Sequence, residues 1–260
     1  MRGIFLKQHY GLSGYQLKMI AIVFMFLDHV YIHVLQPINA PQGFEIFDLL
    51  SRFVAPLFIF LMVEGFFYTR SRKKYLQRLL GAGVIMAVGN IITHLVMHTS
   101  IDFFTILNPN IFLSLAGGFG IIWLLDTIVE DKKWWLVLPL LLVTGITLTM
   151  TEGSLVAALF PYIMYASKKT NKNWILYAGI LLFSLWQLNV AISVGNMGHL
   201  SLIDSLTTNS AFLVFTVLPF IYLYNGQKGG KGTPFEKNFF YGFYPIHIWV
   251  LYIIGQLLIH

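Results

Sequence analysis

The chain has 260 residues, of which 57% are hydrophobic and only 11% are charged, whereas a soluble domain has about 25% charged residues. This composition excludes an ordinary soluble protein and indicates a chain that lies mostly in lipid. The apolar runs are continuous rather than alternating, so they predict membrane-spanning helices and not a β-barrel. No cysteine is present, which excludes disulfides, thiolate metal sites and cysteine nucleophiles.

Nine segments approach the length of about 20 apolar residues that a helix needs to cross a bilayer. They predict an all-α, polytopic integral membrane bundle in one domain, 1–260; in chain order they are 15–35, 46–68, 74–98, 109–129, 134–150, 152–167, 174–195, 209–225 and 239–259. The fifth and sixth segments are short and are joined only by Thr151-Glu152-Gly153. A re-entrant pair is therefore the alternative for these two.

The basic residues follow the loops, so the net charge of +6 is interpreted as a topology signal and not as a nucleic-acid-binding surface. The loops at 36–45, 99–108, 151–153 and 196–208 contain no Lys or Arg. Because basic loops stay in the cytoplasm, the pattern predicts a cytoplasmic N-terminus and an outside C-terminus. The basic residues of the other loops are Arg2, Lys7, Arg70, Arg72, Lys73, Lys74, Arg78, Lys132, Lys133, Lys168, Lys169, Lys172, Lys228, Lys231 and Lys237.

Ionisable residues inside the first two segments are the strongest functional signal, because a charge near the bilayer centre costs roughly 2.5–3.5 kcal/mol. With a rise of 1.5 Å per residue, Asp28 and His29 lie about 5 Å, and Arg52 about 7 Å, to the outer side of the midplane. Lys18 and Glu64 lie about 10 Å to the inner side. The antiparallel segments therefore predict Asp28 opposite Arg52 beside His29, and Lys18 opposite Glu64.

These residue types suit acyl transfer or a proton-coupled step. A histidine can act as general base or nucleophile near neutral pH, and an arginine supplies a fixed positive charge for a developing oxyanion. The alternative is that the charges are ion pairs that only hold the two helices together.

Other polar residues are weaker candidates. Asn90, Asn110 and His247 are predicted to bind substrate or cofactor, with interhelical hydrogen bonds as the alternative. Pro245 leaves a backbone carbonyl unpaired near His247, which makes room for a ligand there. His33 is interpreted as solvated, and residues 226–232 as a flexible loop. No histidine pair has convincing metal-ligand spacing, so no metal is expected.

Several stretches resemble the TraX family of membrane proteins: LKMIAIVFMFLDHVY (17–31), SRFVAPLFIFLMVEGFF (51–67), NPNIFLSLAGGFG (108–120) and FFYGFYPIHIWVL (239–251). That family includes the acetylase that modifies the N-terminus of F-type conjugative pilin. Lys18-x10-His29 and Arg52-x3-Pro56-x-Phe58, leading to Glu64-Gly65-Phe66, are similar to the signature of the membrane acyltransferase-3 superfamily.

The resemblance implies an integral membrane acyltransferase in the bacterial cytoplasmic membrane that takes acetyl from cytoplasmic acetyl-CoA. His29 would be the essential catalytic residue, supported by Lys18 and Arg52. Asp28 and Glu64 complete the predicted catalytic group, and Glu64 departs from the serine that is usual in the superfamily. The CoA phosphates would meet the basic group formed by Arg70, Arg72, Lys73 and Lys74. The implied partners are the CoA donor, membrane lipids and an extracytoplasmic acceptor, which is a peptide amine, a glycan or a lipid.

Two other functions fit the same residues. A proton-coupled transporter would use the intramembrane charges as a relay, although the sequence has no visible internal repeat of the kind that builds many transporters. A noncatalytic membrane scaffold would explain the topology but not the charges at matched depths.

Overall fold

The computed structural model describes residues 11–41, 43–107, 109–150 and 152–259. Within these residues every regular element is a helix, apart from one isolated backbone bridge between Leu12 and Tyr224. The predicted all-α class is therefore confirmed. Arg2, Lys7, Asn108 and Thr151 lie outside the described residues.

Six helical segments are long and apolar enough to cross a membrane: 14–35, 46–68, 72–96, 111–131, 173–197 and 238–259. A bent pair, Leu202–Thr208 and Ser210–Leu223, forms a seventh if the two helices, which meet at 59°, are one span.

The expected number of nine spans is therefore too high for the described part of the chain. The fifth and sixth segments form α7 (Val137–Met150, 14 residues) and α8 (Ser154–Thr170, 17 residues). Helices of these lengths extend about 21 and 26 Å, which is short of the roughly 30 Å hydrocarbon core. Their length fits the re-entrant alternative.

The helices form two compact units. The first contains the described residues of 1–57, 167–237 and 250–260, and the second those of 58–166 and 238–249. The helices α3 (Val54–Tyr68), α8 and α12 (Pro234–Ile259) contribute residues to both. The other helices of the first unit are α1 (Gly14–Val30), η1 (Tyr31–Leu35), α2 (Ile46–Ser51), α9 (Asn173–Met197), α10 (Leu202–Thr208), η3 (Ser210–Val217) and α11 (Leu218–Leu223). Those of the second are α4 (Arg72–Val96), α5 (Phe103–Leu107), α6 (Ile111–Asp131), η2 (Trp134–Leu136) and α7.

In the first unit, the glycine-rich loop at 226–232 is anchored on the start of α1. The Gly14 and Tyr15 N–H groups donate to the carbonyls of Gln227 (2.8 Å) and Lys228 (2.9 Å). Free N–H groups at a helix start require acceptors, and this loop supplies them. Because these contacts fix its backbone, the expectation of a flexible loop is wrong at residues 227 and 228.

The end of the same loop is held by Glu236. Backbone N–H groups, with Lys231 as the largest contributor, hydrogen-bond its carboxylate and lower the pKa of Glu236. The Gly232 N–H makes one of these bonds, at 2.6 Å. The carboxylate therefore ties the loop to the first turn of α12.

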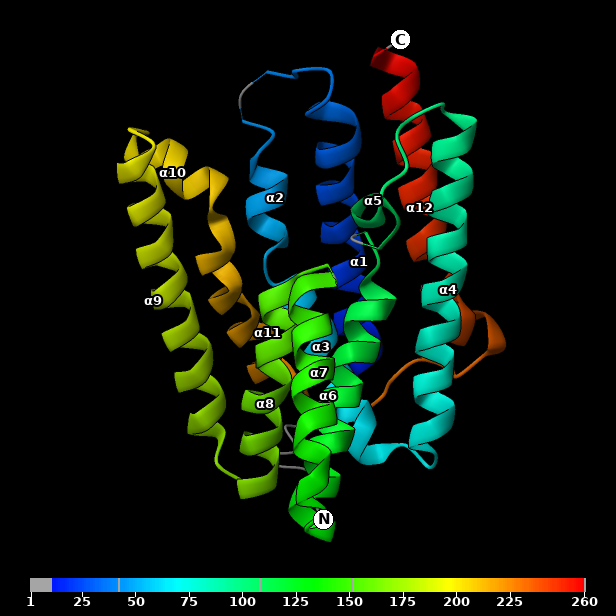
Figure 1. Ribbon diagram of the computed structural model, residues 1–260, viewed down its shortest axis with the longest axis vertical. Coiled ribbons are helices and arrows are strands. Elements are labelled where there is room, and N and C mark those ends of the chain that lie inside the picture. The colour runs from blue at the N-terminus through cyan, green and yellow to red at the C-terminus, as the bar shows by residue number, and fades with distance from the viewer. Residues whose placement is uncertain (1–10, 42, 108, 151, 260) are drawn as a thin grey trace. The chain divides into compact units, whose positions relative to one another are not determined.

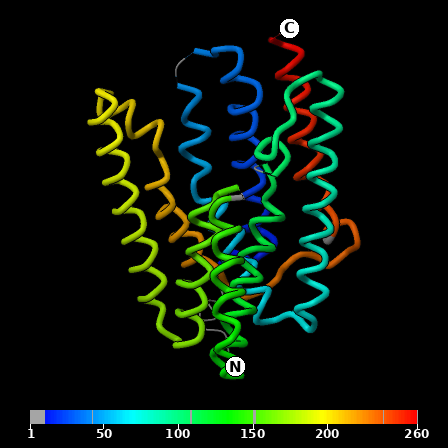
Figure 2. The backbone as a smooth tube through the Cα atoms, in the orientation of Figure 1, coloured from blue at the N-terminus to red at the C-terminus, as the bar shows by residue number. Residues whose placement is uncertain are grey.

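Two spans in the first unit are broken. Arg52 and Phe53 separate α2 from α3, and Pro56 has no N–H to donate to the Arg52 carbonyl. Asn209 separates α10 from η3, and both of these helices pack on α9 (Figures 1 and 2). The sequence thus places one helix break at Arg52 and the other beside Ser210.

In the second unit, the chain folds back along α4 before α6 begins. The Asn90 side-chain amide donates to the Ile106 carbonyl, and that of Asn110 donates to the Gly83 carbonyl, both at 2.9 Å. Gly83 lies near the middle of α4, so α6 starts halfway along its neighbour (Figure 1).

The start of α6 is completed by side chains from two other elements. Glu152, in the turn between α7 and α8, accepts hydrogen bonds from the Tyr244 hydroxyl of α12 and the Asn110 backbone. The Ser114 hydroxyl donates to the Glu152 carbonyl at 2.7 Å. The tip of the α7–α8 hairpin is therefore bound to the beginning of α6.

A substitution at Gly89 of α4 tests how closely the helices of the second unit pack. A Cβ at this position would overlap the Trp249 indole, which also donates a hydrogen bond to Asn90 at 2.9 Å. We expect Gly89→Ala to lower the free energy of unfolding by about 1–3 kcal/mol, because overpacking forces neighbours to move. Thermal unfolding in detergent measures the change.

The matched control is Gly81→Ala in the same helix, where a Cβ meets nothing within 4 Å. There we expect unchanged or higher stability, because alanine is favoured over glycine in a helix by up to about 1 kcal/mol. Equal effects of the two substitutions would contradict the close approach of Gly89 and Trp249.

Candidate active site

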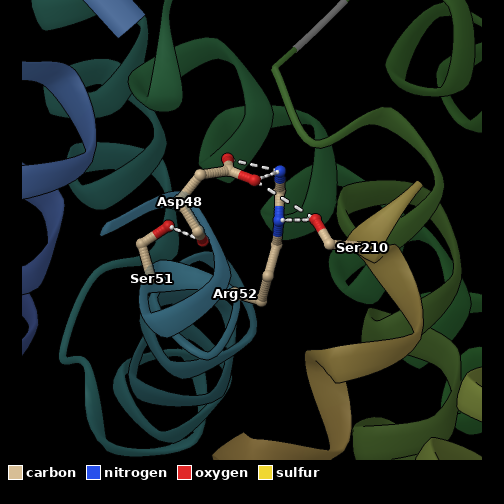
Figure 3. Close-up of polar contacts among 4 residues, drawn as sticks. All are labelled: Asp48, Ser51, Arg52 and Ser210. Carbon is tan, nitrogen blue, oxygen red and sulfur yellow. Dashed lines mark hydrogen bonds and ion pairs between the residues drawn. The ribbon is translucent and has the colours of Figure 1, made fainter. Parts of the chain in front are cut away.

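Arg52, Asp48 and Ser210 form a closed triangle in the first unit (Figure 3). Both carboxylate oxygens of Asp48 accept hydrogen bonds from Nη2 of Arg52. Arg52 Nε donates to the Ser210 hydroxyl at 2.7 Å, and this hydroxyl donates to Asp48 Oδ2 at 3.2 Å. The two helix breaks thus meet at one guanidinium, which is fixed from both sides.

Asp28 of α1 extends this triangle. Its carboxyl lies close to the side chains of Asp48 and Ser51, and it interacts electrostatically with Asp48 and Arg52. The structure therefore places Asp28 beside Arg52, but the ion pair of Arg52 is with Asp48. The reason is local, because residues four apart on a helix face each other.

Two carboxyl groups share the single guanidinium of this cluster. Asp48 forms the ion pair with Arg52, and Asp28 lies beside both residues. Oδ1 of Asp28 is buried and has no hydrogen-bond partner among the described residues. Buried polar atoms normally have partners, so this oxygen is available to a donor that is not part of the described chain.

His29 lies on another side of α1. Successive residues of an α-helix project about 100° apart. Asp28 accordingly reaches α2, while the His29 ring lies 5.8 Å from the ring of His33. His29 is buried, with 7% of its surface exposed. The predicted catalytic role of His29, and that of Asp28 in orienting it, stay predictions.

Lys18 and Glu64 belong to different units, so their predicted pairing stays a prediction. Lys18 is half-buried and interacts electrostatically with Lys228. Glu64 is 4% exposed and lies near Tyr68, one turn further along α3.

Asn90, Asn110 and His247 are all buried in the second unit and have structural partners there. The two asparagines tie α4 to the residues before α6 by the bonds described above. Nδ1 of His247 hydrogen-bonds the Phe243 carbonyl at 2.7 Å, and its ring stacks on Phe243. The contacts of the two asparagines correspond to the alternative of interhelical hydrogen bonds, whereas those of His247 lie within α12. Ligand binding by all three residues stays a prediction.

The residues of the basic group at the start of α4 differ in their contacts. Arg72 forms an ion pair with Asp126 at 2.8 Å, and its guanidinium lies 4.0 Å from the centre of the Phe66 ring. Arg70, Lys73 and Lys74 are exposed. Arg72 therefore has a structural role, and the other three present their charges to the surroundings.

The sequence analysis missed Asp48 and Ser210. Asp48 carries a signal in the sequence, because it lies four residues before Arg52 on a predicted helix. Ser210 is 158 residues from Arg52, and nothing local marks it. No group of three potential metal ligands occurs in the described part of the chain, and the expectation that no metal binds is untested.

A double-mutant cycle tests whether the Asp48–Arg52 pair contributes to stability. We expect Asp48→Asn and Arg52→Gln to show a coupling above about 1 kcal/mol, because the pair is partly buried and shares Ser210. Denaturation of the four proteins in detergent measures the coupling.

The control pair is Asp131 and Lys133, whose side chains are 52% and 49% exposed. Exposed pairs typically contribute less than about 1 kcal/mol. A coupling for Asp48 and Arg52 no larger than that of the control would contradict the closed triangle.

Comparison with known proteins gives two matches. The profile of the family described as "TraX protein" matches residues 13–255. The "Probable fimbrial assembly protein FimC, serogroup H1" of Dichelobacter nodosus is 26% identical over 264 residues, which cover 95% of this chain and 97% of that protein. No solved structure matches the chain.

Proposed function

This chain belongs to the TraX family, and on that premise we propose that it is an integral membrane acyltransferase. The donor is acetyl-CoA from the cytoplasm, and the acceptor is an amine or hydroxyl at the membrane or outside. The observation that carries the proposal is the fixed guanidinium of Arg52, next to the helix that bears His29. Its Nη1 has no partner among the described residues, so its N–H groups are free to bind an oxyanion.

Two side chains, His29 and Arg52, carry out the proposed reaction. His29 takes the proton from the acceptor as its nitrogen or oxygen attacks the thioester carbonyl. Arg52 stabilises the oxyanion of the tetrahedral intermediate. The carbon–sulfur bond then breaks, and the thiolate of CoA takes the proton from His29. A covalent acyl-histidine is the alternative route for the same residue.

The exposed basic residues of the second unit are proposed to bind the phosphates of CoA. Of the predicted basic group, Arg70, Lys73 and Lys74 are exposed. Phosphate binding is proposed from their charge alone, and attraction to anionic lipids is the alternative use of the same residues. Arg72 is left out of this role because Asp126 and Phe66 hold it.

Labelled acetyl-CoA tests the function. Purified protein in lipid nanodiscs should transfer the label to a peptide amine, a glycan or a lipid, and mass spectrometry identifies the product. We expect His29→Ala to lower the rate by about 10²–10⁴-fold and Arg52→Gln by about 10²–10³-fold. His98→Gln is the control, because His98 is exposed and lies in the second unit.

Two results would defeat this assignment. One is near-normal transfer by His29→Ala with intact folding. The other is no transfer to any acceptor class, together with no binding of acetyl-CoA.

We also propose seven spans, with the N-terminus in the cytoplasm and α7–α8 as a re-entrant hairpin. With seven spans instead of nine the number of crossings is still odd, so the C-terminus stays outside. Because the chain has no cysteine, single introduced cysteines report their own position. We expect Lys73→Cys, Lys132→Cys and Lys168→Cys to react with an impermeant maleimide only from the cytoplasm, and Leu200→Cys only from outside. Ser154→Cys should be protected, whereas labelling from outside would show that α7 and α8 both cross.

A proton-coupled transporter is the second candidate, favoured by the two broken spans. Proteoliposomes distinguish the candidates. A transporter moves a solute with protons in the absence of acetyl-CoA, and an acyltransferase consumes acetyl-CoA without net uptake.

A further inference from the structure

A second polar group lies on α1, on the side occupied by His29. His33 follows four residues later, in the π-helical turn η1, where the Gln36 N–H donates to the Tyr31 carbonyl at 2.8 Å. The rings of His29 and His33 are 5.8 Å apart, centre to centre. At this separation there is room for one water molecule to bridge the two rings.

The last part of α12 fixes His33 in place. The Tyr252 ring lies edge-on to the His33 ring at 6.2 Å. Gly255 packs so closely on the His33 carbonyl that a Cβ there would overlap the carbonyl oxygen. His33 is therefore a packed residue of the first unit, and its interpretation as simply solvated is wrong.

The exposed fraction is larger for His33 than for His29. His29 is 7% exposed, and His33, one turn further along the chain in η1, is half-buried. The ionisable groups on and beside this part of the chain come from four elements and the residues that flank α2. They are Asp28 of α1, Tyr31 of η1, Glu45, Asp48 and Arg52 in and beside α2, and Tyr252 of α12. Asp48 and Arg52 interact with Asp28, Glu45 interacts with Tyr31, and the Tyr252 ring contacts His33.

The proton balance of acyl transfer indicates a function for the pair of His29 and His33. An acceptor that arrives as an ammonium group loses two protons when its nitrogen–carbon bond forms. One proton ends on the sulfur of CoA after the carbon–sulfur bond breaks. The other leaves the protein, and it needs a path from a buried base to water.

We propose that His33 is a proton-relay residue that passes the second proton from His29 toward the exposed residue Gln36, which follows η1. An imidazole accepts a proton on one nitrogen and releases one from the other, and intramembrane histidines commonly form such relays. The proposal rests on the proposed acyl transfer. It adds a residue that contacts neither the thioester nor the acceptor.

The test compares His33→Gln with the unaltered protein in nanodiscs, using labelled acetyl-CoA and an amine acceptor. Glutamine keeps the size and hydrogen-bonding capacity of the side chain but does not titrate. We expect steady-state transfer to fall by about 10-fold or more, less than the 10²–10⁴-fold of a group that acts on the substrate, because His33 acts through His29. Added imidazole buffer should restore the rate of His33→Gln but not that of His29→Ala. His199→Gln is the control, because His199 is exposed and lies in the same unit.

Each outcome decides between the proposals. Loss of transfer in His33→Gln with recovery in imidazole supports the relay. Loss without recovery indicates a packing role and overturns it, as does an unchanged rate. Failure of the unaltered protein to transfer acetyl overturns the proposed function itself, and the relay with it.

Discussion

The first unit depends on one guanidinium that two interrupted spans hold between them. Arg52 lies where α2 ends before α3, and Ser210 lies where α10 ends before η3. A charge within a membrane span is stable only when it is paired and hydrogen-bonded. The Asp48 carboxylate and the Ser210 hydroxyl meet this requirement, and they also fix the direction in which Nη1 points.

Helix breaks make such an arrangement possible. An intact helix satisfies its own backbone groups, so a break needs a cause and a substitute for the lost bonds. Pro56 causes the first break by removing a donor. In the second unit, the start of α6 lies beside the middle of α4, and Glu152 with Tyr244 supplies its partners. Both units therefore place polar groups at interruptions between helices.

The sequence alone predicted the features that depend on composition and depth. The all-α class follows from continuous apolar runs, and the proximity of Asp28 to Arg52 follows from counting residues along two antiparallel helices. The number of spans was wrong because α7 and α8 are apolar but short. Hydropathy measures the preference of a segment for lipid. It does not show whether the segment crosses the bilayer or turns back within it. Ser210 was beyond local reasoning, because only the fold brings it to Arg52.

A buried acyl transfer has two requirements, oxyanion stabilisation and proton transfer, and the residues proposed for them lie on different sides of α1. Oxyanion stabilisation requires a charge that does not move or titrate, and a clamped arginine meets this requirement. Proton transfer requires a group that gains and loses its charge easily, which suits histidine. The turn of about 100° between Asp28 and His29 directs Asp28 toward α2, whereas His29 lies beside His33, which contacts Tyr252 of α12.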